Sequence, residues 1–157
     1  MEPCDIDLGG VKQISHTADI GLIARADSLE GLFSLCGTGL VEVIVGRSIE
    51  QFIGDLEQNS VKRIKLVQKI TGFDLENLLI TFLTEILYRL EAENLLVISS
   101  QLNLRVEENE LNVSFECIEY DPERQGYFRE VKAVTYHRLS IVNCNDGTWA
   151  ARVILDI

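Results

Sequence analysis

The chain has 157 residues, of which 46% are hydrophobic and 25% charged, and it contains only two prolines. This is ordinary globular usage with little room for a disordered linker, so we expect a single domain spanning residues 1–157. The net charge of −11, with 14 Lys and Arg residues, argues against tight direct binding of nucleic acid. It suits a basic partner protein or a hard cation, although an acidic surface also serves solubility.

No membrane-targeting signal is visible along the chain. The first ten residues, MEPCDIDLGG, carry acids where a secretory signal needs basic residues, and no apolar core segment follows them. The longest apolar stretches, around Leu40–Val45 and Leu75–Leu90, are interrupted by polar residues and could not cross about 30 Å of hydrocarbon. We therefore expect a cytoplasmic protein without a membrane span.

A strand and a helix are predicted in the first third of the chain. Asp19–Ala26 is rich in Ile, Leu and Ala, which favours a strand, and Ser28 can cap a following helix. Three glycines weaken this helix by up to about 1 kcal/mol each, so either it packs closely on a sheet or its boundaries differ. Its apolar residues share one face: Leu29, Leu32, Phe33, Cys36, Leu40 and Val43.

A second strand and a longer helix follow. Ser60–Ile70 alternates apolar and basic side chains, which predicts a half-buried strand. Asp74 can cap the next helix, and Glu85 can pair with Arg89 on its outer side. The apolar residues of this helix recur at helical spacing and indicate core: Leu75, Leu78, Leu79, Phe82, Ile86, Leu87 and Leu90.

The last third predicts strands joined by turns. Apolar residues alternate on both sides of Glu107–Glu110, which indicates an antiparallel hairpin with a solvated acidic tip. A loop is expected at Asp121–Arg129, and Asn145-Asp146-Gly147 supplies a turn between strands at Glu130–Val142 and Thr148–Ile157. The predicted fold is α+β, with mainly antiparallel sheet and two principal helices.

Several kinds of chemistry find no support in the sequence. The four cysteines, Cys4, Cys36, Cys117 and Cys144, lie far apart without zinc-ligand spacing, and a cytosolic setting favours thiols over disulfides. Glycine-rich phosphate loops and a GxSxG nucleophile motif are also missing. We therefore assign the cysteines no function and expect no covalent hydrolysis.

The end of the chain is a candidate cation site. Apolar residues alternate up to Ile157, so the sheet should hold the terminal carboxylate beside Asp156. Two carboxylates held this close repel each other, and a cation would relieve the repulsion. Oxygen ligands favour Mg²⁺, Mn²⁺ or Ca²⁺, and Ca²⁺ best tolerates the irregular geometry of a terminus. The alternative is an exposed acidic end without a metal.

Two further segments have both a functional and a structural interpretation. In Ser15-His16-Thr17-Ala18-Asp19, the side chains of His16 and Asp19 could serve a site at a strand end or only bond to local backbone. Lys132 could neutralise clustered carboxylates or an incoming phosphate, or it could be an ordinary exposed lysine. His137 lies on the opposite strand face from Lys132, so it makes a poor dyad with His16.

The sequence resembles the archease family in three separated blocks. They read HTADIGLIARADSLEGLF at His16–Phe33, EVKAVTYHRLSI at Glu130–Ile141 and ARVILDI at Ala151–Ile157. The middle of the chain agrees with the family only in pattern. The family often has Asp immediately before HTAD, and Ser15 stands there in this chain.

This resemblance implies an archease-like fold and a cytoplasmic activator of an RtcB-type tRNA-splicing ligase. Such an activator promotes GTP-dependent guanylylation and repeated turnover of the ligase, and it meets GTP and tRNA only through that partner. Asp19, Asp156 and the Ile157 carboxylate become ligands of a divalent metal, preferentially Ca²⁺. Lys132 becomes a functional residue, and His16 supports the ligands. A stand-alone metal-dependent hydrolase and a non-catalytic acidic interaction module are the alternatives.

Overall fold

The computed structural model describes residues 1–15, 17–57 and 61–157, without the side chain of Glu57. Seven strands, four α-helices and two short 3₁₀ turns are found in this part of the chain. In chain order they are η1 (Pro3–Asp5), β1 (Val11–Ser15), β2 (Asp19–Ala26), α1 (Leu29–Val45), α2 (Ile49–Glu57), β3 (Arg63–Thr71), α3 (Leu75–Glu93), β4 (Leu95–Arg105), η2 (Val106–Glu108), β5 (Glu110–Glu119), α4 (Pro122–Gln125), β6 (Ala133–Asn143) and β7 (Trp149–Asp156).

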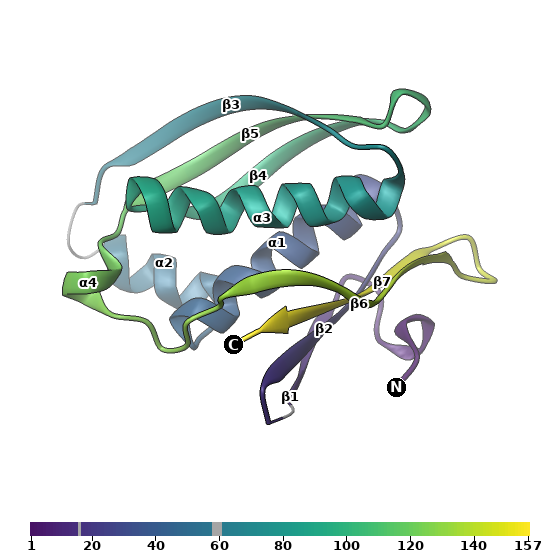
Figure 1. The fold of residues 1–157 in the computed structure, drawn as a ribbon, viewed down its shortest axis with the longest axis horizontal. Helices are drawn as coiled ribbons and strands as arrows, with labels where there is room; N and C mark the ends of the chain where they lie inside the picture. Colours follow the sequence, from purple (N-terminus) through teal and green to yellow (C-terminus); the bar gives the residue numbers. More distant parts are fainter. Residues whose placement is uncertain (16, 58–60) are drawn as a thin grey trace.

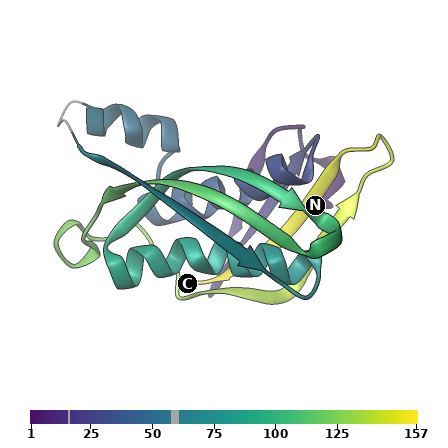
Figure 2. The ribbon, with the colours of Figure 1, turned by 90° about the horizontal axis from the view of Figure 1, so that it is seen from above.

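The strands form two antiparallel sheets with the long helices between them. One sheet has the order β1-β2-β7-β6, and the other has the order β3-β5-β4. Figure 1 shows α1 and α3 enclosed between the sheets, and Figure 2 shows the three-stranded sheet from above, lying over the helices. The prediction of an α+β fold with mainly antiparallel sheet and two principal helices is confirmed.

Local capping signals in the sequence place both long helices. Ser28 Oγ accepts a hydrogen bond from the Gly31 N–H at 3.0 Å and starts α1. Asp74 Oδ1 accepts one from the Asn77 N–H at 2.7 Å and starts α3. Because these oxygens satisfy N–H groups that lack partners within the helix, each helix begins one residue after its predicted cap.

The glycines of α1 allow close packing between layers. A Cβ on Gly37 would lie 3.1 Å from Ile86 Cδ1 and 3.3 Å from the Phe82 ring of α3. A Cβ on Gly39 would lie only 2.8 Å from Val11 Cγ2 of β1. The expectation that this helix packs closely on a sheet is therefore confirmed, and it packs equally closely on the neighbouring helix.

Besides the short helix α4 (Pro122–Gln125), which lies inside the loop predicted at Asp121–Arg129, one strand and one longer helix were not predicted. β1 pairs with β2 from Val11 opposite Ala24 to Ser15 opposite Ile20, although its own sequence is half-exposed and polar. α2 begins after Ser48, whose Oγ accepts the Gln51 N–H at 3.2 Å, and it buries Phe52. Each is short, so pairing and packing with distant segments stabilise it more than its own local preference does.

The acidic hairpin tip also differs from the prediction. Glu107 and Glu108 are exposed, as expected. Glu110 instead forms an ion pair with Lys69, whose Nζ lies 2.7 Å from a carboxylate oxygen of Glu110. The hydrogen bond from Lys69 holds the pKa of the Glu110 carboxyl below its usual value. Glu110 therefore joins β5 to β3 rather than serving only as a solvated tip.

No single helix in residues 1–15, 17–57 and 61–157 is long and apolar enough to cross a membrane. The segments Leu29–Val45 and Ile49–Leu56 meet that criterion only as a pair, and the chain bends by 63° between them.

Candidate functional site

The two predicted metal-binding aspartates lie opposite each other at one end of the four-stranded sheet. β2 begins at Asp19, β7 ends at Asp156, and these two residues are Cα partners in the antiparallel register. Directly opposed residues share a sheet face, with Cβ atoms about 4.5–5.5 Å apart. Segments separated by almost the whole chain thus bring two carboxylates together.

Ile157 and Lys132 reach the same end of the sheet through their backbones. The Ile157 N–H donates to the Ala18 carbonyl at 3.4 Å, and the Lys132 N–H donates to the Asp156 carbonyl at 2.8 Å. Lys132 is exposed, and its side chain has no hydrogen bond or ion pair with the described residues. His16, the remaining predicted residue, lies outside the described residues.

The donors at this end fit a hard cation better than zinc or copper. Within the described part of the chain, no group of three or more His, Cys, Asp and Glu side chains is arranged to hold a metal ion. Asp19 and Asp156 form a pair, and Ile157, the third predicted ligand, lies beside Ala18. Such an oxygen-only set is typical of Ca²⁺, Mg²⁺ or Mn²⁺.

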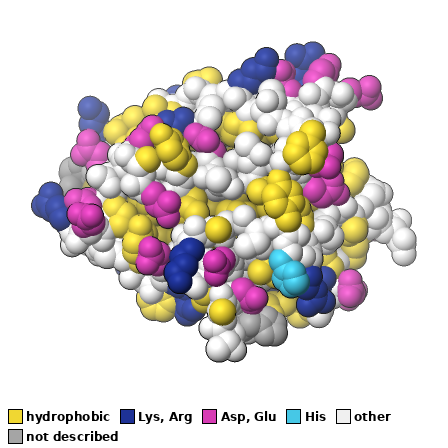
Figure 3. All heavy atoms as spheres, in the orientation of Figure 1, with side chains coloured by type: hydrophobic (Ala, Val, Ile, Leu, Met, Phe, Trp, Pro, Cys, Tyr) yellow, Lys and Arg dark blue, Asp and Glu magenta, His cyan; other side chains and the backbone are white. Residues whose placement is uncertain are grey.

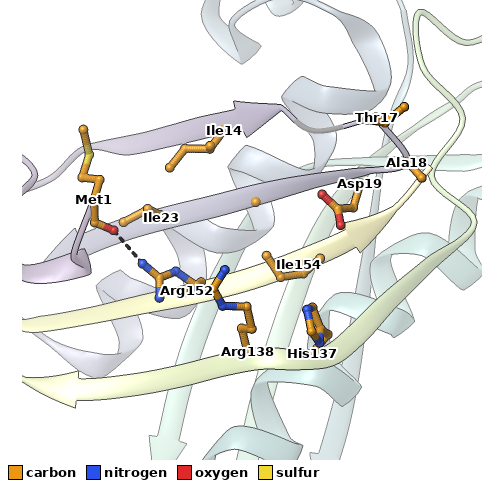
Figure 4. A pocket seen from close by; sticks show the side chains of 11 residues that line it. Met1, Ile14, Thr17, Ala18, Asp19, Ile23, His137, Arg138, Arg152 and Ile154 are labelled. Atoms are coloured by element: carbon orange, nitrogen blue, oxygen red, sulfur yellow. Dashed lines mark hydrogen bonds between the residues drawn. The ribbon is translucent and has the colours of Figure 1, made fainter.

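A hollow of about 450 Å³ extends from Asp19 over the outer face of the sheet. Isoleucines line part of it, and among the described residues that line it Asp19 is the one acid. Figure 4 shows Arg152 from β7 and Arg138 and His137 from β6 directed into the same space, with Arg152 Nη2 donating to the Met1 carbonyl at 2.6 Å. The carboxylate end therefore borders a pocket that is mainly basic.

Sequence reasoning did not identify the arginines of this hollow. It predicted continuous alternation through Glu130–Val142, but β6 begins at Ala133 and its register with β7 shifts between Thr135 and Ser140. Arg138 lies in that irregularity with a φ of 52°. One residue could have indicated this hollow: Arg152 is a charged residue within the otherwise apolar stretch Trp149–Leu155.

A disulfide holds the N-terminal segment near the hollow and corrects one prediction. Cys4 and Cys144 are bonded, with their Cα atoms 5.9 Å apart, whereas thiols were expected for all four cysteines. Their sequence separation of 140 residues concealed this proximity. Cys36 and Cys117 are buried free thiols as expected, and burial raises their pKa values to about 12 and about 11, respectively.

The fold and the site define a class: small layered β-α-β proteins with a carboxylate pair at one sheet end. The chain matches the model of the archease protein family (MTH1598/TM1083) over residues 12–157. It therefore belongs to the archease family. Ser15 pairs with Ile20 at the end of β1.

Individual relatives agree over nearly the full length. Protein archease of Pyrococcus furiosus is 33% identical over 145 residues, covering 90% of this chain and 94% of that one. Protein archease of Methanosarcina mazei is 31% identical over 147 residues, covering 92% and 93%. The solution structure of Methanobacterium thermoautotrophicum protein 1598 superposes with a TM-score of 0.64 at 24% identity, covering 95% of this chain and 99% of that one, and supports the fold.

Proposed function

We propose that this protein activates an RtcB-type tRNA-splicing RNA ligase, promoting GTP-dependent guanylylation and repeated turnover without sealing RNA itself. Membership of the archease family supports this proposal. The observation that carries it is the register of β2 and β7, which sets Asp19 directly opposite Asp156. An acidic pair at an accessible sheet end suits a protein that organises a cation for a partner's active site.

In this proposal Asp19, Asp156 and the Ile157 carboxylate hold a divalent ion, preferentially Ca²⁺, with Mg²⁺ or Mn²⁺ as substitutes. When bound, such an ion would offset negative charge on a phosphate. Lys132 is joined to Asp156 through the backbone and would orient the carboxylates or meet a phosphate. His16 would support the ligands.

The ligase, rather than this protein, would bind GTP for guanylylation and tRNA. The net charge of −11 disfavours direct capture of a polyanion. On the face seen in Figure 3, basic side chains are scattered among acidic ones and form no continuous basic surface. We place the protein in the cytoplasm with its ligase. Disulfides are uncommon there, so the state of Cys4 and Cys144 in protein taken from cells tests that placement.

Single-turnover guanylylation of the cognate ligase, with and without this protein, tests the proposal. The wild type should accelerate guanylylation, and Asp156→Ala should not, while keeping a native circular dichroism spectrum. Glu107→Gln is the matched control, because it removes one exposed carboxylate at the β4–β5 tip. A glycine added after Ile157 should also impair activation, since it replaces the terminal carboxylate with an amide.

Three outcomes would contradict the proposal. Full activation by Asp156→Ala would favour an interaction module whose acidic end binds no metal. Absence of divalent-ion binding in calorimetry would favour the same alternative. Turnover of phosphoesters by the purified protein with Mg²⁺ or Mn²⁺, abolished in Asp19→Ala, would identify a stand-alone hydrolase.

A further inference from the structure

The hollow beside the carboxylate pair has a charge opposite to that of the protein as a whole. The chain carries a net charge of −11. Among the described residues that line this hollow, Arg138, Arg152 and His137 are accompanied by a single acid, Asp19, at one end. Figure 4 shows the guanidinium groups of Arg138 and Arg152 close together, with His137 apart from them near Ile154. Convergent basic groups over an apolar floor are typical of a site for an anionic small molecule.

Arg138 is held in a conformation that local structure does not favour. Its φ of 52° is left-handed, a conformation that residues with a side chain rarely adopt. Within the described residues, its guanidinium makes neither a hydrogen bond nor an ion pair. The irregular segment between Thr135 and Ser140 thus presents an uncompensated cation to the hollow.

Arg152 supplies a second guanidinium that is partly anchored. One nitrogen donates to the Met1 carbonyl at 2.6 Å, and this bond uses one of the five N–H groups of the side chain. The strand register places Arg152 opposite Ile23 of β2 on one side and Ser140 of β6 on the other. An anchored guanidinium with free N–H groups is suited to bidentate binding of a phosphate.

The floor of the hollow is apolar and open. Ile14, Ile23 and Ile154 line it, and Gly21 contributes no side chain between them. A Cβ added at Gly21 would lie 3.4 Å from Ile154 Cδ1, so any larger side chain would occupy the space above the floor. The volume of about 450 Å³ is typical of a pocket for a drug-sized molecule and suits a nucleoside better than a polymer.

We propose that this hollow binds a nucleotide, with Arg138 and Arg152 holding its phosphates and the isoleucine floor contacting its nucleoside. Asp19 belongs to both the hollow and the carboxylate pair, so a divalent ion there would meet the phosphates at one end. The inference extends the proposed function by giving this protein its own nucleotide site. Its test uses the isolated protein and does not require the ligase.

The first experiment measures equilibrium binding of GTP and of inorganic triphosphate by calorimetry in EDTA and in Ca²⁺. Wild-type protein should bind both saturably in EDTA, and Ca²⁺ should strengthen binding. Arg138→Ala and Arg152→Ala should each weaken binding about tenfold or more, because each removes charge-assisted hydrogen bonds. Arg124→Ala is the matched control, since it removes an exposed guanidinium on α4 and should change affinity less than about twofold.

Two further variants separate the parts of the proposal. Asp19→Asn should abolish the strengthening by Ca²⁺ but keep or improve binding in EDTA, because it removes a charge that repels phosphate. Gly21→Val should weaken GTP binding while leaving triphosphate binding unchanged, because it fills the floor but not the phosphate end.

The proposal is overturned if wild-type protein shows no saturable binding of either probe at millimolar concentration, or if Arg124→Ala weakens binding as much as Arg138→Ala. Equal GTP affinity in Gly21→Val and wild type would overturn the nucleoside contact. Failure of the metal site alone would instead leave binding in EDTA intact and remove only the Ca²⁺ effect.

Discussion

Replacing Asp156 with Asn should change stability in opposite directions with and without metal. Asp19 and Asp156 are directly opposed across β2 and β7. Like charges in such a pair destabilise a sheet by roughly 0.2–1 kcal/mol. For a chain of 157 residues, each kcal/mol corresponds to roughly 2–4 °C in Tm. In EDTA, Asp156→Asn should therefore melt up to about 4 °C above wild type.

Saturating metal should reverse that order. Ligand at 100 times its Kd stabilises the folded state by about 2.7 kcal/mol, which raises the Tm of a chain this size by roughly 5–11 °C. Wild type should show this increase with Ca²⁺, and Asp156→Asn should lose most of it because one ligand is neutral. Differential scanning calorimetry in EDTA and in a Ca²⁺ series measures both effects.

Glu107→Gln separates this effect from a general response to net charge. It removes the same charge at an exposed position on η2, so its Tm should follow wild type in both conditions. The reasoning is refuted if Asp156→Asn is less stable than wild type in EDTA, or if it keeps the full increase with Ca²⁺.

Three other measurements test the structure. Thiol titration should find no reactive cysteine in the native protein, because Cys4 is bonded to Cys144 and the other two thiols are buried. It should find two reactive cysteines after unfolding and four after unfolding with reduction. Two reactive thiols in the native protein would contradict this description. Lys69→Ala should lower stability at pH 7, because Lys69 lowers the pKa of Glu110 and that contribution exists only above the carboxyl's pKa values. In urea titrations the difference should disappear as the pH falls through the lowered pKa, and a difference that persists at low pH would argue against the pair. Phe82→Ala should cost about 3–5 kcal/mol in urea unfolding, because Phe82 is fully buried between Phe33 and Phe115; a loss below about 1 kcal/mol would mean that this core is not packed as described.

Local signals in the sequence were sufficient for the long elements. Helix caps, alternation and turn residues act over a few neighbours, so Ser28, Asp74 and Asn145-Asp146-Gly147 placed their elements within one or two residues. Asp19 and Asp156 were selected by family resemblance, and the β2–β7 register then brought them together.

The remaining features depend on long-range contacts that no sequence window contains. The Cys4–Cys144 bond joins segments that only the completed four-stranded sheet brings together. The irregularity around Arg138 arises where β6 loses its regular pairing with β7, and continued alternation would have turned that side chain elsewhere. The basic hollow was therefore missed although its residues lie within the family-like blocks.

The bond between Cys4 and Cys144 also closes the chain covalently. Residues 4–144 become a ring, and the strand β7 with its preceding turn follows it in the chain. A protease that cuts once inside the ring, for example near Gly126, opens it without releasing a fragment. Both pieces then remain linked through this bond, so a nicked molecule keeps Asp19 and Asp156 in one covalent unit.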